Sequence, residues 1–385
     1  MKNLIKQPSI HFRNGVTGEK YIDIWKELES GLWKEIKPEN MLGNALIMGV
    51  DRTDYKPIIE NYHLMRPGML WDEQNKRPFD PVCIPNISDS NLEKFLIEAY
   101  RFFKQFDGKH IGVQLSGGLD SSLIIVLLKY FNIPFSLVAL VNKRFEFRTE
   151  SHIQNLLSKY GTNTVLIDYE TCLPYSNIEN VPLHQYPEEY IRTFGPDFEM
   201  SKKCKEMGIE ILLTGQGGDN VFGDVVPKET KECEWMPHTF NDTWLQDLVY
   251  SPMGIVQVSF YSDVKIMEHI FKLRSGRKED VSKYWARQFF KDFLPRELVQ
   301  YTYHSDFWGF IIDGVQNVMP QIPTLFEQAY DLTQNPYFSK DKVKELMKID
   351  LLDHKKETYM QIEPLLSIAV WLDGLVKAEI IKELK

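Results

Sequence analysis

Phosphate-binding chemistry is concentrated in one short segment, Ser116-Gly-Gly-Leu-Asp-Ser-Ser122. Gly117 and Gly118 allow the backbone to turn sharply, so that its N–H groups face a ligand. Ser121 and Ser122 open the helix expected next, and the N-terminus of that helix adds unpaired N–H groups and a partial positive charge. The segment therefore predicts an anion site that uses backbone and hydroxyl donors and needs no lysine.

Asp120 is the acidic residue of this turn. A carboxylate beside a bound phosphate is repulsive unless a divalent cation lies between them, so Asp120 is predicted to be a Mg²⁺ ligand. The segment is not a Walker-type loop, because that loop needs four residues between its glycines and then a Lys-Ser or Lys-Thr pair. Neither GKS nor GKT occurs in the chain.

Alternating strands and helices are expected around the turn. Short apolar runs predict strands, and the longer segments between them predict helices, one of which is closed by Gly161. Strands separated by helices are typical of an open α/β fold with a doubly wound parallel sheet, whose ligand crevice lies at the carboxyl ends of the strands. The predicted strands are 111–115, 134–141, 163–168 and 210–214, and the predicted helices include 149–160 and 198–207.

A second glycine-rich turn follows the last of these strands, Gly215-Gln-Gly-Gly-Asp-Asn-Val-Phe222. Because both turns follow parallel strands, Asp219 can face Asp120 across the crevice although the two are distant in sequence. Two carboxylates placed in this way could share a metal ion. On its own, such a turn is equally well explained by a solvated aspartate, but its pairing with the first turn favours the metal interpretation.

Together, the two turns resemble the synthetase domain of a family that contains asparagine synthetases, β-lactam synthetases and lasso-peptide cyclases. The resemblance rests on SGGLDSS and GQGGDNVF and covers most of residues 86–310. It implies an adenine nucleotide α-hydrolase-like fold and an ATP pyrophosphatase reaction with ATP and Mg²⁺. It also implies that Asp120 and Asp219 hold the metal, that residues of the first turn hold pyrophosphate, and that residues at the strand ends contact the nucleoside. The pyrophosphate residues are Ser116, Gly117, Gly118, Asp120 and Ser121, and the nucleoside residues are Leu115, Thr214 and Gly215.

The chain departs from this family at positions that matter for catalysis. Glutamine-using members begin with a cysteine nucleophile, whereas this chain begins Met-Lys and its first cysteine is Cys83, so glutamine is not expected to supply nitrogen. Gln216 stands where the family has Glu or Tyr and cannot act as a carboxylate base. Tyr303 stands at the family's catalytic lysine, with His304 next to it. Tyr303 and His304 are therefore the candidate catalytic residues for stabilising an oxyanion, with packing as the alternative interpretation.

A domain boundary is predicted near residue 86. It separates an N-terminal extension, 1–85, to which no function is assigned, from a synthetase-like domain, 86–385. Within the extension, spacing predicts a helix over 21–33 and a strand at 45–50, and three prolines predict a linker at 77–85.

Helices are predicted on both sides of the glycine turns. Ser90 is expected to cap an amphipathic helix over 90–106, because Glu93 stands in capping-box register with it. After about residue 243 the chain is predicted to be mainly helical, with helices at 341–353 and 364–384.

Composition argues against several other classes of function. With a net charge of −9 the chain has no general attraction for polyanions, so a nucleic-acid substrate is not expected. The four cysteines form no CxxC pair or metal-like cluster, which is typical of a reduced cytoplasmic protein without a zinc site. The first residues lack the apolar core of a signal peptide and no apolar run approaches about 20 residues, so no membrane association is expected.

These features predict an ATP-dependent amide-forming ligase that adenylates a substrate carboxylate, releases AMP and pyrophosphate, and joins the acyl group to an amine. An amine on the same molecule is favoured, which predicts a lactam or macrolactam formed on a precursor peptide. Three alternatives stay open: an ammonia-dependent asparagine synthetase, a tRNA-modifying ATP pyrophosphatase, and a non-catalytic nucleotide-binding homologue. The tyrosine at position 303 supports the last of these.

Overall fold

The chain forms two compact units, each built from segments that are distant in sequence. The sheet unit comprises Val82–Thr171 and Asp197–Ser305, and the helical unit comprises Met1–Pro81, Cys172–Pro196 and Asp306–Lys385. Both glycine turns belong to the sheet unit. The computed structural model describes residues 11–14, 16–17, 20–21, 24–46, 57–65, 70–79, 87–141, 150–160, 163–168, 172–187, 189–222, 246–274, 283–300, 308–348 and 356–381.

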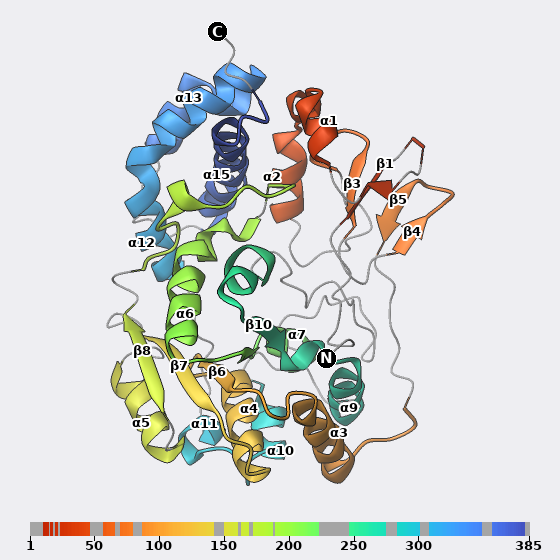
Figure 1. Cartoon of the computed structure of the whole chain (residues 1–385), viewed down its shortest axis with the longest axis vertical. Helices are drawn as coiled ribbons and strands as arrows, with labels where there is room; N and C mark the ends of the chain where they lie inside the picture. The colour runs from red at the N-terminus through yellow and green to blue at the C-terminus, as the bar shows by residue number, and fades with distance from the viewer. Residues whose placement is uncertain are drawn as a thin grey trace. The chain divides into compact units, whose positions relative to one another are not determined.

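A five-stranded parallel sheet forms the centre of the sheet unit, with its strands in the order β10-β9-β6-β7-β8 (Figure 1). All six residues of β7 are buried, because a central parallel strand is covered on both faces, and its sequence after Ser136 is continuously apolar. The predicted α/β fold with a parallel sheet is confirmed. The strands are β6 Ile111–Leu115, β7 Ser136–Val141, β8 Thr164–Asp168, β9 Ile211–Thr214 and β10 Val256–Ser259.

Helices pack around this sheet and complete its core. The buried face of α3 carries Phe95, Phe102 and Phe103, whose rings contact Phe260 with centroids 5.1–6.5 Å apart. Such aromatic pairs stabilise a core beyond the area they bury. The helices of the sheet unit are α3 Leu92–Lys104, α4 Leu119–Tyr130, α5 Glu150–Tyr160, α7 Gly218–Phe222, α9 Val264–Arg274, α10 Tyr284–Phe289 and α11 Arg296–Gln300, and α6 Phe194–Glu206 begins before the boundary at residue 197.

The helical unit has its own core, in which α2 and α13 both pack against α15. The helices are α1 Trp25–Glu29, α2 Pro38–Leu46, α12 Trp308–Val318, α13 Ile322–Thr333, α14 Lys340–Met347 and α15 Lys356–Lys377. Five short strands are paired antiparallel, as β2-β1-β3 and β4-β5: β1 His11–Asn14, β2 Lys20–Tyr21, β3 Tyr62–Met65, β4 Leu70–Asp72 and β5 Arg77–Phe79. None of the helices described combines the length and apolarity needed to cross a membrane.

The start of α3 differs from the prediction by one residue. Asn91 is the N-cap, and its side chain accepts a hydrogen bond of 2.9 Å from the backbone N–H of Lys94. Ser90, the predicted cap, instead forms a hydrogen bond of 2.7 Å with Nδ1 of His269 in α9. Asn and Ser cap helices about equally well, so the tertiary contact to α9 decides which of them does so here.

Two local predictions for the N-terminal extension are wrong. A strand is predicted at 45–50, but Ala45 and Leu46 are the last residues of α2, and 47–50 lie outside the described residues. Arg77–Phe79, assigned to a linker, forms β5, in which Pro78 is tolerated because an edge strand need not donate every hydrogen bond. The described part of the chain after residue 243 is mainly helical, as predicted, although it also contains the strand β10.

Candidate active site

The two glycine turns lie at the same edge of the sheet, as predicted. β6 and β9 are paired neighbours in which Val113 lies opposite Leu213. The first turn follows β6 and places Gly118 at the N-cap of α4, whereas the second follows β9 and leads into α7. Because these strands are parallel, both turns leave from carboxyl ends, where open α/β sheets bind their ligands.

Serine side chains hold the first turn in shape. Ser121 Oγ accepts a hydrogen bond of 3.1 Å from the Ser116 backbone N–H and lies 3.0 Å from Ser116 Oγ. Ser116 Oγ also accepts from the Gly118 N–H at 3.4 Å. Gly117 has φ of +82°, a left-handed conformation that glycine adopts without strain. The structure therefore brings together the residues predicted to bind pyrophosphate.

The residues predicted to contact a nucleoside also lie at this edge. Leu115 and Thr214 are the last residues of their strands, and both side chains are buried. Thr214 Oγ1 has no hydrogen-bond partner within the described part of the chain. A buried hydroxyl without a partner costs free energy, which a polar ligand group could recover. Ser122, the remaining predicted residue of the first turn, is fully buried in α4.

The second turn lies directly against Asp120, and this contact requires glycine. A Cβ atom added to Gly218 would lie 2.3 Å from Cγ of Asp120 and 2.6 Å from its Oδ2. One added to Gly215 would lie 2.9 Å from the backbone nitrogen of Ser121. The glycines of GQGGD therefore allow one turn to approach the other closely enough for Asp120 and Asp219 to face the same point.

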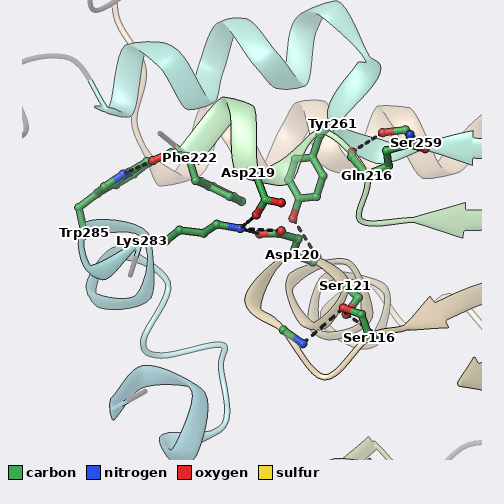
Figure 2. Close-up of polar contacts among 11 residues, drawn as sticks. Ser116, Asp120, Ser121, Gln216, Asp219, Phe222, Ser259, Tyr261, Lys283 and Trp285 are labelled. Carbon is green, nitrogen blue, oxygen red and sulfur yellow. Dashed lines mark hydrogen bonds and ion pairs between the residues drawn. The ribbon is translucent and has the colours of Figure 1, made fainter. Parts of the chain in front are cut away.

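Lys283 lies at that point, between the two carboxylates (Figure 2). Its Nζ is 2.9 Å from Asp120 Oδ1 and 2.7 Å from Oδ2, and it also donates to Asp219 Oδ1. The lysine side chain is only 8% exposed. Lys283 immediately precedes α10, which is attached to the second turn by a hydrogen bond of 3.0 Å from Trp285 Nε1 to the backbone oxygen of Phe222.

The electrostatics of this cluster follow from its burial. Burial raises the pKa of Asp120 to about 6, the negative charge of Asp219 adds to the rise, and Lys283 opposes it. Burial also acts to lower the pKa of Lys283, but the two carboxylates outweigh it and the pKa is raised above its usual value. Lys283 is therefore an ammonium at neutral pH. One positive and two negative charges leave the cluster with a net charge of −1.

The residues present fit Mg²⁺ as an ion that nucleotide phosphates would help to hold. Asp120 and Asp219 both contact the Lys283 ammonium, so their carboxylates are already close together. The 53% exposure of the Asp219 side chain leaves its carboxylate accessible. Among the described residues no group of three or more His, Cys, Asp or Glu side chains could bind a metal unaided. Mg²⁺ commonly binds in proteins through one or two carboxylates together with phosphates and water.

Lys283 was not predicted from the sequence as a site residue. Lys283 lies among aromatic and basic residues, and nothing local distinguishes it from the other lysines there. The signal that could have indicated it is electrostatic: two carboxylates that are buried side by side require a positive charge close to them. Tyr303 and His304, the predicted catalytic residues, lie outside the described residues, so their role stays a prediction.

Comparison with known proteins identifies the region that carries both turns. Residues 105–253 match the asparagine synthase family model. This range includes Asp120 and Asp219 but ends before Lys283.

Curated relatives and a solved structure show weaker, partial similarity. Asparagine synthetase 3 (glutamine-hydrolysing) of Arabidopsis thaliana is 28% identical over 159 residues, which are 38% of this chain and 25% of that protein. Asparagine synthetase B (glutamine-hydrolysing) of Escherichia coli K12 is 28% identical over 162 residues, which are 36% of this chain and 27% of that protein. The chain thus spans about a quarter of the length of these relatives. The U34-tRNA thiolase NcsA of Methanococcus maripaludis aligns over 67% of this chain and 82% of its own, with 15% identity and a TM-score of 0.31. Residues 105–253 are a domain of the asparagine synthase family, of the ATP pyrophosphatase type.

Proposed function

We propose that this protein is an ATP-dependent carbon–nitrogen ligase that activates a substrate carboxylate as an acyl-adenylate. The observation that carries the proposal is the contact of Lys283 with both Asp120 and Asp219 beside a phosphate-type turn. A serine-rich turn without acidic groups could serve any anion. Two carboxylates and a buried ammonium at the same sheet edge instead suit a polyphosphate that arrives with a divalent cation.

The reaction proposed has two steps. A carboxylate oxygen of the substrate attacks the α-phosphorus of ATP, and the bond from that phosphorus to the bridging oxygen breaks, so that pyrophosphate leaves. An amine nitrogen then attacks the acyl carbon, loses a proton, and displaces AMP. The products are an amide, AMP and pyrophosphate, which balances the atoms of the carboxylate, the amine and ATP.

Each part of the site has a role in the first step. The N–H groups of the first turn and the start of α4 would bind the phosphate oxygens. Lys283 provides positive charge where negative charge grows on the departing pyrophosphate, in a buried position that strengthens the interaction. Asp120 and Asp219 would hold Mg²⁺, which supplies further charge neutralisation when bound. Lys283 also weakens the case for a non-catalytic homologue, because the lysine missing at position 303 is not the sole cation available.

The nitrogen source we propose is an amine on the same molecule as the activated carboxylate. Neither Cys172 nor Cys204, the cysteines with described side chains, is placed to hydrolyse glutamine, because both are buried. Burial raises the pKa of Cys204 to about 12, which removes its nucleophilic thiolate at neutral pH. An intramolecular amine avoids a second bimolecular encounter, an advantage of roughly 7–11 kcal/mol when the ends are held in place. The proposed product is a lactam or macrolactam, formed on a short peptide that carries Asp or Glu.

The test is product analysis with Mg-ATP and defined substrates. One sample contains a candidate precursor peptide, and a second contains aspartate with ammonium. The expected result is AMP and pyrophosphate, with a peptide lighter by one water. Asparagine from the second sample would favour the ammonia-dependent synthetase instead, and ADP with phosphate in either sample would reject the adenylation chemistry.

A further inference from the structure

One short segment, distinct from both turns, is hydrogen-bonded to each of them. The segment consists of β10 and the 3₁₀ turn Phe260–Ser262 that follows it. Ser259 Oγ donates to the backbone oxygen of Gln216 at 2.7 Å, and Tyr261 Oη donates to the backbone oxygen of Asp120 at 2.8 Å (Figure 2). Two residues only two positions apart therefore fix the second turn and the first turn relative to a common support.

The support itself is held firmly. Ser259 lies opposite Thr214 in the parallel pairing of β10 with β9. Tyr261 is fully buried, and its ring packs edge-on against Phe222 of α7 with centroids 5.3 Å apart. A side chain locked by packing on several sides holds its hydroxyl in one place, which is the condition for positioning a neighbour accurately.

The hydroxyl of Tyr261 acts on the backbone of the residue whose side chain meets Lys283. A tyrosine hydroxyl keeps its proton at neutral pH, so it is available as the donor to the Asp120 carbonyl. Fixing that carbonyl restricts where the Asp120 carboxylate can lie in relation to Asp219 and Lys283.

We infer that Tyr261 is a positioning residue, which sets the Asp120 carboxylate against Asp219 and Lys283 for adenylation. The inference rests on the proposed function for its readout. It assigns Tyr261 no contact with the substrate. Ser259 has the corresponding role for the second turn, through the Gln216 carbonyl.

The test compares Tyr261→Phe with Tyr250→Phe. Tyr250 is also fully buried in the sheet unit, and its hydroxyl donates a hydrogen bond of 2.7 Å to Asp197 Oδ1, which is remote in sequence from both turns. Each variant loses one buried hydroxyl and keeps the ring. Denaturation midpoints control for stability, since Tyr250→Phe is expected to lower the midpoint at least as much as Tyr261→Phe.

The expected result is a fall in kcat for AMP formation of about 10- to 100-fold in Tyr261→Phe, since a displacement of about 1 Å at a reacting group can cost 10²-fold. KM for Mg-ATP should rise, but by a smaller factor than kcat falls, and Tyr250→Phe should retain kcat within about twofold of the wild type. Ser259→Ala should lower kcat in the same direction. The expectations for Tyr250→Phe and Ser259→Ala follow from the same argument, since Ser259 is hydrogen-bonded to the second turn, whereas the Tyr250 hydroxyl donates to Asp197.

The outcomes separate this inference from the proposed function. If the wild type forms AMP and Tyr261→Phe keeps its kcat, or if both tyrosine variants lose kcat equally, the positioning role is wrong and the function stands. If the wild type forms no AMP, the proposed function fails. The positioning role is then tested by calorimetry, which compares the Mg-ATP affinities of Tyr261→Phe and the wild type. A Tyr261→Phe affinity equal to that of the wild type, or no binding by the wild type, would then reject it.

Discussion

Nζ of Lys283 lies 2.7 Å from Oδ2 of Asp120, although 163 positions separate the two residues in the chain. The ammonium also contacts Asp219, so a single side chain joins the glycine turns that follow β6 and β9. Removing one partner from a buried ion pair costs more than the pair contributes, because the remaining charge is left uncompensated. Lys283 is thus expected to support both folding and activity.

Replacing Lys283 with methionine should lower the free energy of unfolding by about 3–5 kcal/mol, because two facing carboxylates would lose the cation between them. AMP formation should be lost as well. Urea unfolding at pH 7 measures the first effect, and a pyrophosphate-release assay measures the second.

The matched control is Lys203→Met. Lys203 pairs with Glu206 at 2.7 Å, but the two side chains are 38% and 58% exposed, so this change should cost less than about 1 kcal/mol. Equal destabilisation by the two substitutions would show that the Lys283 cluster is not a buried ion pair in solution.

Gly218→Ala should reduce AMP formation by about 10²-fold or more, because its new Cβ would lie 2.3 Å from Cγ of Asp120 and would force the carboxylate to move. Gly374→Ala is the control. Among the described residues outside its own helix, its Cβ would meet nothing closer than Cδ1 of Leu183, at 3.6 Å, and alanine in the last turn of α15 should add up to about 1 kcal/mol of stability. Full activity in Gly218→Ala would mean that the two turns do not approach each other as described.

The stability of the protein should fall as the pH is lowered from about 6.5 to 4, in part because of His184. Burial lowers the pKa of His184 to about 4, so the folded protein keeps this imidazole neutral while the unfolded chain binds a proton. The contribution is present above pH 6.5 and is lost as the pH falls towards 4, by roughly 3 kcal/mol in total.

His184→Asn tests this assignment, since asparagine does not titrate and can still donate to the Pro182 oxygen that His184 Nδ1 contacts at 2.9 Å. Urea unfolding of both proteins between pH 7 and pH 4 should give curves that converge as the pH falls. Parallel curves would indicate that His184 is not the titrating group.

Chelation of divalent cations should abolish AMP formation without unfolding the protein. Lys283 already holds the two carboxylates together, so in the absence of nucleotide EDTA should leave the melting temperature unchanged. With ATP present, added Mg²⁺ should raise the melting temperature, since a ligand that binds only the folded state stabilises it. A melting temperature that drops with EDTA alone would point to a resident structural metal.

The sequence predicted the parts of the fold that local pattern determines. The continuous apolar run at β7 is confirmed, because burial on both faces leaves a clear signal in a central strand. β10 gave no such signal, since it is an edge strand whose four residues are all at least partly exposed. The Asp120 turn could be predicted from its glycines and serines, whereas Lys283 could not, because only the tertiary fold brings it there.

The sequence separation between Asp120 and Lys283 also sets a delay during synthesis. A ribosome adds roughly 5–20 residues per second, so the 163 positions between the two residues take about 8–30 s to complete. During that time the nascent chain holds the Asp120 turn, and later the Asp219 turn, without the lysine that pairs with both carboxylates. The contact of Lys283 with the two carboxylates therefore forms late in the synthesis of each molecule. A chain truncated after α9 lacks Lys283 and cannot form it.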